Sequence, residues 1–298
     1  MGKILVSGVV NVENNLKVDS FPVAYNPVNF AFFGINTNVA GVGFNIAKAL
    51  ATLGDEVSLV SMIGDDVNAD AVLCKLEKTG ISTKYVKMIA KNTPQSIIMY
   101  DNEGKRQIFT DLKDLQELSF PVDDFEKAQS DSDILVLTNI NYSRGLLKKA
   151  KETKKLIATD VQAISDIEDS YNKDFLENAD ILFFSNDKLL DAASGFMQDL
   201  IKKYNHKIIV SGLGEKGALM YVREQDTVFS FNAVKTRPIV NTVGAGDALF
   251  SSFIHFYAKT KDPHVSIKKA MLFASFKIGE SGATNGFLTE KELEDLEA

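Results

Sequence analysis

Short apolar runs alternate with polar, helix-forming stretches along the chain from about residue 133 onward. Apolar runs that alternate with helices are typical of strands buried on both faces of a parallel sheet. The C-terminal third adds two longer helical segments. This alternation predicts an α/β body in which a doubly wound, mostly parallel sheet lies between two layers of helices. The predicted strands are 134–137, 156–159, 181–184 and 208–210, and the predicted helices include 144–155, 245–260 and 265–280.

The first third of the chain has a different pattern, in which residues 12–39 combine prolines with alternating and aromatic residues. Three later segments read as further short strands, and an Asn102–Gly104 turn joins the last two of them. These strands predict a small sheet that projects from the body, either as a peripheral hairpin or as a lid over an active site. The short strands are 84–90, 95–100 and 105–110; the body comprises 1–11, 40–83 and 112–298, and the small β lid comprises 12–39 and 84–111.

Composition limits where the protein works and what it binds. The formal net charge of −7 argues against a nucleic-acid backbone as the main partner. No apolar run reaches the roughly 18 residues that span a bilayer, and the first residues read as a buried strand rather than a secretory signal. Cys74 is the only cysteine, which excludes an intrachain disulfide and favours the reducing cytoplasm. We therefore expect a cytoplasmic protein that binds neither nucleic acid nor membrane.

The strongest chemical signal is the segment Asn241–Asp247, which reads Asn-Thr-Val-Gly-Ala-Gly-Asp and leads directly into a helical run. Glycines just before a helix allow backbone N–H groups to converge on one point, and the helix dipole adds positive potential there. Such amides suit the negative charge of a phosphoryl group in transfer. Asp247 could cap the helix, and beside an anion site it could also accept the proton of an attacking hydroxyl.

This segment resembles the C-terminal signature of the ribokinase-like, PfkB-type carbohydrate kinases, Asp-Thr-x-Gly-Ala-Gly-Asp. Thr242–Asp247 match every position after the first. The N-terminal signature of that family, a Gly-rich turn that enters a helix with an Asn, is similar to Gly41–Leu50. Gly8–Glu13, at the end of the first predicted strand, stand where the family places polar contacts to its substrate. The resemblance spans nearly the whole chain and implies the family's three-layer α/β fold with a small β lid.

The resemblance also implies catalytic roles. Asp247 would take the proton from the substrate hydroxyl as that hydroxyl attacks the γ-phosphate of ATP. The backbone amides of Gly244, Ala245 and Gly246 would supply the anion hole. Both assignments agree with the chemistry of the segment, because amides before a helix bind anions and a nearby carboxylate can act as a base.

Substrate contacts are implied for polar and glycine residues near the N-terminus. Glu13 stands where ribokinases have an Asp that accepts hydrogen bonds from sugar hydroxyls. Without the two signatures, Asn11 and Glu13 would be read as turn polarity after a strand, and Asn45 as a helix cap. The implied substrate residues are Asn11, Glu13, Gly41, Gly43 and Asn45.

A third glycine-rich segment follows the predicted strand 208–210. A dinucleotide fingerprint would require a helix next, whereas Ala218–Val222 continues as a strand, so these glycines form a turn between strands. In the resembling family the corresponding loop lies against the nucleotide, although a plain turn has the same pattern. The implied nucleotide-binding residues are Asn186, Gly212, Gly214, Gly217 and Thr242.

Two departures from the family pattern concern metal ions. Asn186 matches the first position of the family's Asn-x-x-Glu motif, which organises Mg²⁺ through water, but Leu189 stands in the Glu position. The metal ligands therefore stay open, with Asp187 as either a substitute or a helix-start carboxylate. Mg²⁺ is still expected with ATP, because polyphosphate chemistry normally needs the metal to offset charge. Asn241 replaces the Asp that helps to bind a monovalent cation in potassium-activated relatives, so we do not expect potassium activation.

The phosphate acceptor also stays open. Val42 replaces the Lys that ribokinases and several sugar-phosphate kinases have between the signature glycines. The aromatic residues of Tyr25–Phe33 could stack on a nucleobase, or they could pack in the lid or in a dimer contact. Arg106 and Lys113 could reach an anionic substrate group or remain in solvent.

We predict an ATP-dependent carbohydrate kinase that phosphorylates a primary hydroxyl of a sugar or sugar derivative. A nucleoside kinase that uses the same site is the alternative. A non-catalytic binding member of the family is a third interpretation, against which the intact segment Gly244–Asp247 counts. A homodimer through the lid would pair the open edges of the small sheet.

Overall fold

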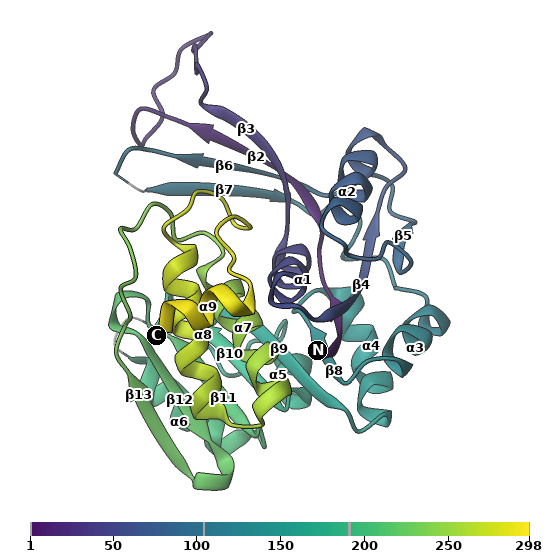
Figure 1. Cartoon of the computed structure of the whole chain (residues 1–298). Helices are drawn as coiled ribbons and strands as arrows, with labels where there is room; N and C mark the ends of the chain where they lie inside the picture. Colours follow the sequence, from purple (N-terminus) through teal and green to yellow (C-terminus); the bar gives the residue numbers. More distant parts are fainter. Residues whose placement is uncertain (1, 104, 190–191, 298) are drawn as a thin grey trace.

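A computed structural model describes residues 2–103, 105–189 and 192–297, so Gly104 of the predicted turn lies outside the described residues. The described strands of the body form one nine-stranded sheet in the order β13-β12-β11-β10-β9-β8-β1-β4-β5 (Figure 1). Every pairing from β5 to β11 is parallel, and the last two pairings are antiparallel. The strands are β1 Lys3–Ser7, β4 Glu56–Ile63, β5 Val86–Met88, β8 Ile134–Leu137, β9 Leu156–Ala163, β10 Ile181–Ser185, β11 Ile208–Gly212, β12 Ala218–Val222 and β13 Thr227–Phe231.

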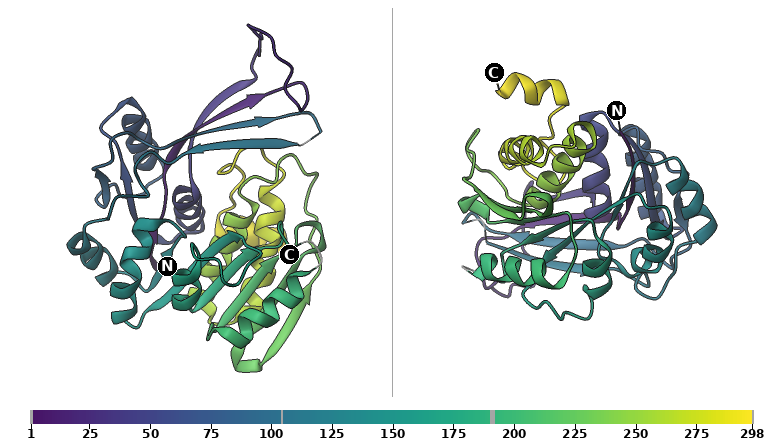
Figure 2. Two further views of the ribbon diagram at one scale, coloured as in Figure 1. Left: turned by 180° about the vertical axis from the view of Figure 1, so that it is seen from behind. Right: turned by 90° about the horizontal axis from the view of Figure 1, so that it is seen from below.

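The apolar strands serve two cores, because successive side chains point to opposite faces of a sheet. In β8, Ile134 and Val136 pack into one core, whereas Leu135 and Leu137 pack into the other. The first core is covered by α1 Val42–Leu53, α2 Val67–Lys78, α7 Ala245–Thr260 and α8 Pro263–Lys277. The second is covered by α3 Val122–Ser130, α4 Asn141–Glu152, α5 Lys173–Asn178 and α6 Ala193–Lys203 (Figure 2). The predicted three-layer α/β body is confirmed.

Four further strands form a separate small sheet above the body, in the order β3-β2-β6-β7 (Figure 1). The strand β5 is not part of this sheet, because it pairs with β4 at the edge of the large sheet. The assignment of residues 84–90 to the lid is therefore wrong for β5. A three-residue strand that follows α2 in a β-α-β connection belongs with the parallel sheet. The small sheet comprises β2 Asn11–Lys17, β3 Ile35–Ala40, β6 Gln95–Tyr100 and β7 Arg106–Asp111.

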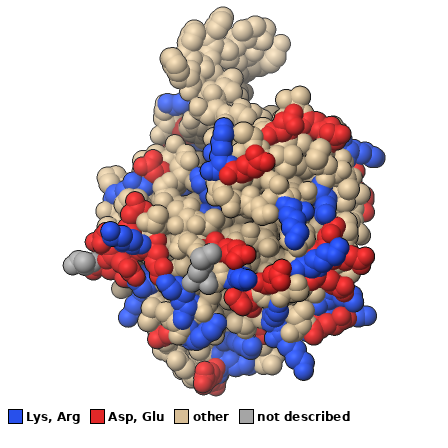
Figure 3. Space-filling model, turned by 45° about the vertical axis from the view of Figure 1, so that its right-hand side comes forward, with Lys and Arg blue, Asp and Glu red and all other residues tan. Residues whose placement is uncertain are grey.

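The loop between β2 and β3 projects beyond the small sheet and exposes aromatic side chains. Residues 20–34 contain no Asp, Glu, Lys or Arg, and the projecting tip is correspondingly uncharged on the face seen in Figure 3. The side chains of Tyr25, Phe30, Phe32 and Phe33 are each at least 80% exposed. Exposed apolar groups at this density are unusual on a monomer and typical of a contact surface.

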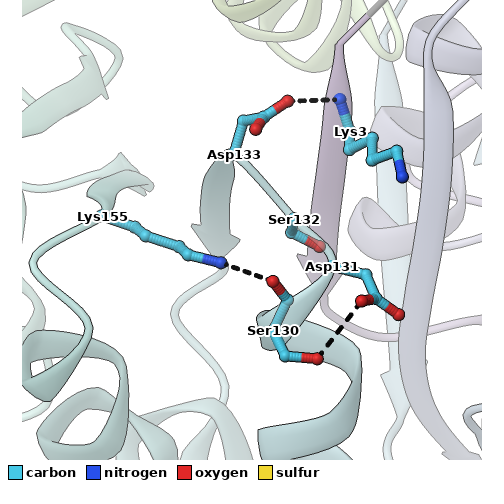
Figure 4. A pocket seen from close by; sticks show the side chains of 6 residues that line it. All are labelled: Lys3, Ser130, Asp131, Ser132, Asp133 and Lys155. Carbon is cyan, nitrogen blue, oxygen red and sulfur yellow. Dashed lines mark hydrogen bonds between the residues drawn. The ribbon is translucent and has the colours of Figure 1, made fainter.

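A polar hollow opens at the amino-terminal ends of β1, β8 and β9 (Figure 4). Two of its charged groups are already paired, since the Asp133 carboxylate accepts from the Lys3 amide at 3.1 Å and the Lys155 ammonium donates to the Ser130 carbonyl at 3.0 Å. Ligands of open α/β sheets bind outside the carboxyl ends of the strands. We therefore assign the candidate site to the opposite edge, where the small sheet and the helix N-termini meet.

Candidate active site

Two helices begin at the carboxyl edge of the large sheet and bring the two signature segments together. Helix α1 starts after Gly41 and helix α7 after Gly244. From α1, Asn45 Nδ2 donates a hydrogen bond to Asp247 Oδ2 in α7 over 2.7 Å. Both side chains are buried, at 5% and 7% exposure. The sequence singled out these residues separately, and the fold joins them in one contact.

Glycines allow both helices to begin this deep in the fold. A Cβ on Gly43 would lie 2.4 Å from the carbonyl carbon of Gly8, so α1 starts in backbone contact with the end of β1. Gly244 has a left-handed φ of 78°, and a Cβ there would lie 2.4 Å from the carbonyl oxygen of Ala283. Any side chain at either position would push the backbone apart.

The backbone before α7 leaves amide groups free for an anion. Asn241 Oδ1 accepts from the Val243 amide at 2.7 Å, and the Ala245 amide donates to the Thr242 carbonyl at 3.2 Å. The Ala245 amide is therefore already used within its turn. In the described chain, the amides of Gly244, Gly246 and Asp247 donate no such bond. These are first-turn amides at the positive end of the helix dipole, where an anion is stabilised.

Burial sets the acidity of Asp247. Desolvation raises the pKa of its carboxyl from 3.8 to about 6, while the hydrogen bond from Asn45 and the positive charge of Lys277 act in the opposite direction. A carboxylate with a pKa just below neutral is mostly ionised at pH 7 and still basic enough to accept a proton. The environment of Asp247 therefore fits a general base.

Sequence reasoning missed a second carboxyl in the same space, that of Asp160 in β9. This side chain is 6% exposed, and its Oδ1 accepts from the Gln162 amide at 2.8 Å. Burial, together with the negative charge of Asp247, raises the pKa of Asp160 to about 7. Its signal was available, because Asp160 directly follows the predicted strand 156–159, at the edge of the sheet where polar residues after other strands were selected.

Sequence reasoning also missed Lys277, the last residue of α8. Its side chain is fully buried, and its ammonium donates to the carbonyls of Val243 and Gly282. Burial lowers the pKa of Lys277 to about 8, and the carboxylates of Asp247 and Glu13 partly counteract this. A lysine at a helix end has no sequence feature that distinguishes it from surface lysines.

The small sheet presents a polar face to this space. Residues 11, 13 and 15 share one face of β2, because side chains alternate along a strand, and Asn11 Nδ2 donates to Ser96 Oγ in β6 at 3.0 Å. Asn15 Nδ2 donates to Glu13 Oε1 at 3.0 Å. Burial raises the pKa of Glu13 above its usual value. Across the strand pair, Asn38 lies opposite Glu13 and Asn36 opposite Asn15.

Two buried amide oxygens on this side of the site have no hydrogen-bond partner in the described chain. They are Oδ1 of Asn11 and Oδ1 of Asn45. A buried acceptor without a donor is unfavourable by about 1–3 kcal/mol. Both oxygens therefore suit a ligand that brings hydroxyl or N–H donors.

One contact joins the small sheet to the loop before α7. Arg106 Nη1, at the start of β7, donates to Thr242 Oγ1 over 3.4 Å. Arg106 thus lies at this site, whereas the Lys113 ammonium pairs with Asp111.

Four of the five predicted nucleotide residues lie at or next to the ends of neighbouring strands, and the fifth, Thr242, lies in the loop before α7. The Asn186 amide, just after β10, donates to the Gly212 carbonyl at the end of β11 over 3.2 Å. Gly214 and Gly217 belong to the tight turn between β11 and β12, and both have positive φ. A Cβ on Gly217 would lie 2.0 Å from the Phe231 carbonyl oxygen. The close approach of the Phe231 backbone therefore explains why position 217 requires glycine, without any contact to a nucleotide.

The residues present fit Mg²⁺ only in part. Leu189, which replaces the family's Glu, packs against the second core. No group of three or more His, Cys, Asp or Glu side chains suited to a metal occurs among the described residues. Mg²⁺ bound with a nucleotide needs only one or two carboxylates, because phosphates and water supply its other ligands. Asp160, a buried carboxyl that shares this space with Asp247, could supply such a ligand.

Comparisons with known proteins identify the family to which the sequence is similar. Residues 1–290 match the sequence model of the family described as pfkB family carbohydrate kinase. The chain is 28% identical to a deoxyribokinase of Salmonella typhi over 274 residues, with 83% of each chain covered. It is 24% identical to a ribokinase of Lactococcus lactis subsp. lactis, with 96% of this chain and 94% of the relative covered.

Solved structures show the same fold. A microbiome-derived acarbose kinase superposes with a TM-score of 0.90 at 24% identity, covering 99% of this chain and 98% of its own. A nucleoside kinase of Methanocaldococcus jannaschii superposes with a TM-score of 0.80 at 19% identity, covering 99% and 98%. Among the described helices of the present chain, none is both long and apolar enough to cross a membrane.

Proposed function

The chain belongs to the pfkB family of carbohydrate kinases, and we propose that it transfers the γ-phosphate of ATP to a primary hydroxyl of a sugar or sugar derivative. The observation that carries this proposal is the contact between Asn45 and Asp247 beside the first-turn amides of α7. A base and an anion site then face one space, which is the arrangement that phosphoryl transfer to an alcohol requires.

In the proposed reaction the acceptor oxygen attacks the γ-phosphorus, and the bond from that phosphorus to the bridging oxygen of ADP breaks. The hydroxyl proton passes to the Asp247 carboxylate. The amides of Gly244 and Gly246, with that of Asp247, hold the oxygens of the transferred group. The hydrogen bond from Asn45 keeps the carboxylate oriented and favours its ionised form, because it lowers the pKa.

ATP is the proposed phosphate donor, and Mg²⁺ is expected to accompany it. When bound, the ion would offset the negative charge of the phosphates. Asp160 is the proposed protein ligand, which leaves the Asp247 carboxylate free to accept the proton. The loop around Gly212 and Gly214, next to Asn186, is the proposed contact for the nucleotide.

The polar face of the small sheet supports a hydroxyl-rich acceptor. Amide and carboxylate groups of Asn11, Glu13 and Asn15 line this face, and hydroxyl groups can both donate to and accept from them. The unpaired oxygens of Asn11 and Asn45 call for donors. Such an acceptor binds between the small sheet and Asp247, which makes the small sheet a lid in this proposal.

The features that suggested a nucleoside do not favour one over a sugar. The aromatic residues of 25–33 stand on the projecting loop at 80% exposure or more.

A homodimer through the lid is supported by these exposed aromatic side chains and by β7, which is exposed along its whole length and forms an open edge of the small sheet. Light scattering on the purified protein tests this arrangement, and a monomer at micromolar concentration would refute it.

An ATP-consumption screen over sugars, sugar phosphates and nucleosides tests the proposed function. We expect turnover with a neutral sugar or sugar derivative. Turnover with nucleosides alone would reassign the acceptor, and no turnover with any acceptor would favour a non-catalytic member of the family.

A further inference from the structure

The Lys277 ammonium lies beneath the loop that forms the proposed anion hole. Among the described lysines, only Lys277 is fully buried. Its Nζ donates to the Val243 carbonyl, in the loop before α7, and over 2.8 Å to the Gly282 carbonyl, in the loop after α8. A single cation therefore ties together two loops that are distant in sequence.

The bond to Val243 determines where the next amide points. The C=O of Val243 and the N–H of Gly244 belong to one planar trans peptide unit, so they point in opposite directions. Because the Val243 carbonyl points toward the Lys277 ammonium, the Gly244 N–H points away from it. Gly244 also packs against Ala283, one residue beyond the second carbonyl that Lys277 binds. The loop before α7 thus rests on a segment that Lys277 itself fixes.

The charge of this lysine is not explained by stability alone. Its two hydrogen-bond acceptors are neutral carbonyls, and a buried charge that lacks a close ion pair is unfavourable. Asp247 and Glu13 act on Lys277 through their charges from α7 and β2, and Arg106 acts on it from β7. A positive charge in this place adds attraction for a negatively charged group in front of the loop.

We propose that Lys277 is a positioning residue for phosphoryl transfer, which fixes the Val243–Gly244 peptide so that the Gly244 amide faces the transferred group. The inference rests on the proposed function, because it concerns the same anion hole. Lys277 does not touch the substrate in this proposal. It acts through the backbone of the loop and through its charge.

Lys48 provides a matched control for the structural role of such a lysine. Its Nζ, from α1, donates to the Thr284 carbonyl at 2.7 Å, in the same segment after α8. Burial lowers the pKa of Lys48 as well. Lys48 differs in that, among the described residues, its hydrogen bond reaches only the Thr284 carbonyl and not the loop before α7. Lys48→Met should therefore remove a buried ammonium that holds the same segment, while the bond from Lys277 to the Val243 carbonyl stays in place.

The test compares Lys277→Met and Lys48→Met with the wild-type chain. We would measure binding of ADP with Mg²⁺, and of ADP with Mg²⁺ and aluminium fluoride, by calorimetry; the fluoride complex imitates the phosphoryl group in transfer. In Lys277→Met we expect affinity for the fluoride complex to fall about tenfold or more, and affinity for ADP to change less than about threefold. We also expect kcat to fall about a hundredfold. In Lys48→Met the two affinities should keep their wild-type ratio.

Three results would overturn the inference. The first is an equal loss of both affinities in Lys277→Met, which would indicate a structural role only. The second is an unchanged affinity for the fluoride complex. The third is the same selective loss in Lys48→Met. If Lys277→Met does not fold, Lys277→Gln, which keeps a donor for one carbonyl without the charge, serves in its place.

The same measurements separate this inference from the proposed function. Because the fluoride complex is studied without an acceptor, it reports on the anion hole even if no sugar is turned over. A wild-type chain that shows the affinity difference but phosphorylates nothing would overturn the proposed acceptor chemistry alone. A wild-type chain that binds ADP with and without aluminium fluoride equally would overturn the anion hole and the role of Lys277 together.

Discussion

Asn45 Nδ2 and Asp247 Oδ2 lie 2.7 Å apart, although 202 residues separate them along the chain. The contact joins the first turns of α1 and α7, which carry the two signature segments of the family. Its partners are buried, and it is a charge-assisted bond whenever Asp247 is ionised. The protonation of Asp247 and the integrity of this contact are therefore linked.

Replacement of the proposed base is the most direct prediction. Asp247→Asn keeps the shape of the side chain but cannot accept the hydroxyl proton, so we expect kcat to fall by about a hundredfold to ten-thousandfold. Circular dichroism and thermal unfolding should show an intact fold. Asp65→Asn, at an exposed position, should keep wild-type turnover. A folded Asp247→Asn variant with a tenth of wild-type activity would show that Asp247 is not the base.

Removal of the amide partner should change the pH dependence of the reaction. The hydrogen bond from Asn45 lowers the pKa of Asp247, so in Asn45→Ala that pKa should rise above about 6. The acid limb of the kcat/KM profile should then move to higher pH, because that limb reports the base of the free enzyme. Thr52→Ala, on the same helix, is the control, because in the described part of the chain the Thr52 hydroxyl bonds only to the Lys48 carbonyl. An unmoved acid limb in Asn45→Ala would contradict the role of the contact.

The buried charge of Asp247 should reduce stability at neutral pH. Its folded-state pKa is raised from 3.8 to about 6, so the folded protein binds this proton more tightly than the unfolded chain. That contribution is fully present below the unfolded pKa and is lost as the pH rises through about 6. Asp247→Asn should therefore raise the free energy of unfolding at pH 8 by about 1–3 kcal/mol, and by less at pH 5. Urea denaturation at both pH values measures this; a difference that does not depend on pH would contradict the buried charge.

Gly244 should tolerate no side chain. Gly244→Ala would place a Cβ 2.4 Å from the Ala283 carbonyl oxygen at a φ of 78°, so we expect lower thermal stability and a loss of turnover of about a hundredfold or more. Gly145, in α4, has no neighbour within 4 Å of an added Cβ. Gly145→Ala should accordingly raise stability by about 0.5–1 kcal/mol without affecting activity. Equal behaviour of the two variants would show that the backbone at Gly244 is not constrained.

Asp160 should control the requirement for magnesium. Asp160→Asn removes one of the two buried carboxyls of the site, so we expect half-maximal activity to need several times more free Mg²⁺. Titration of activity against free Mg²⁺ at saturating ATP measures this, with Asp65→Asn as the control. An unchanged midpoint would exclude Asp160 as a ligand of the ion.

Prediction from the sequence succeeded where the residue types of one short segment indicate how that segment must be packed. The runs at 134–137 and 181–184 are apolar at every position, and strands of this kind must be covered on both faces. The glycines before Asp247 similarly predict the start of a helix whose first amides are free to bind an anion. For β5, three residues long, the local pattern did not indicate which sheet it joins, because that depends on pairing with β4.

The rest of the site depends on tertiary placement. Lys277 looks like any lysine at the end of a helix, and its role follows from where α8 ends beneath the loop before α7. Asp160 follows a predicted strand as Asn186 does, but it stands outside the motifs from which the site residues were selected. The predicted anion hole loses one of its three donors, because the Ala245 amide donates to the Thr242 carbonyl in its own turn. A hydrogen bond of this kind is a property of the folded backbone and not of residue type.

The contact between α1 and α7 has a consequence for how the protein is made. The base, the amides beside it and the loop behind them come from the last quarter of the chain, whereas Asn45 emerges from the ribosome early. A nascent chain can thus complete most of its parallel sheet while it still lacks the proposed base and the proposed anion hole, which belong to α7 and the loop before it. Phosphoryl transfer by the proposed mechanism therefore has to await the docking of α7 against α1.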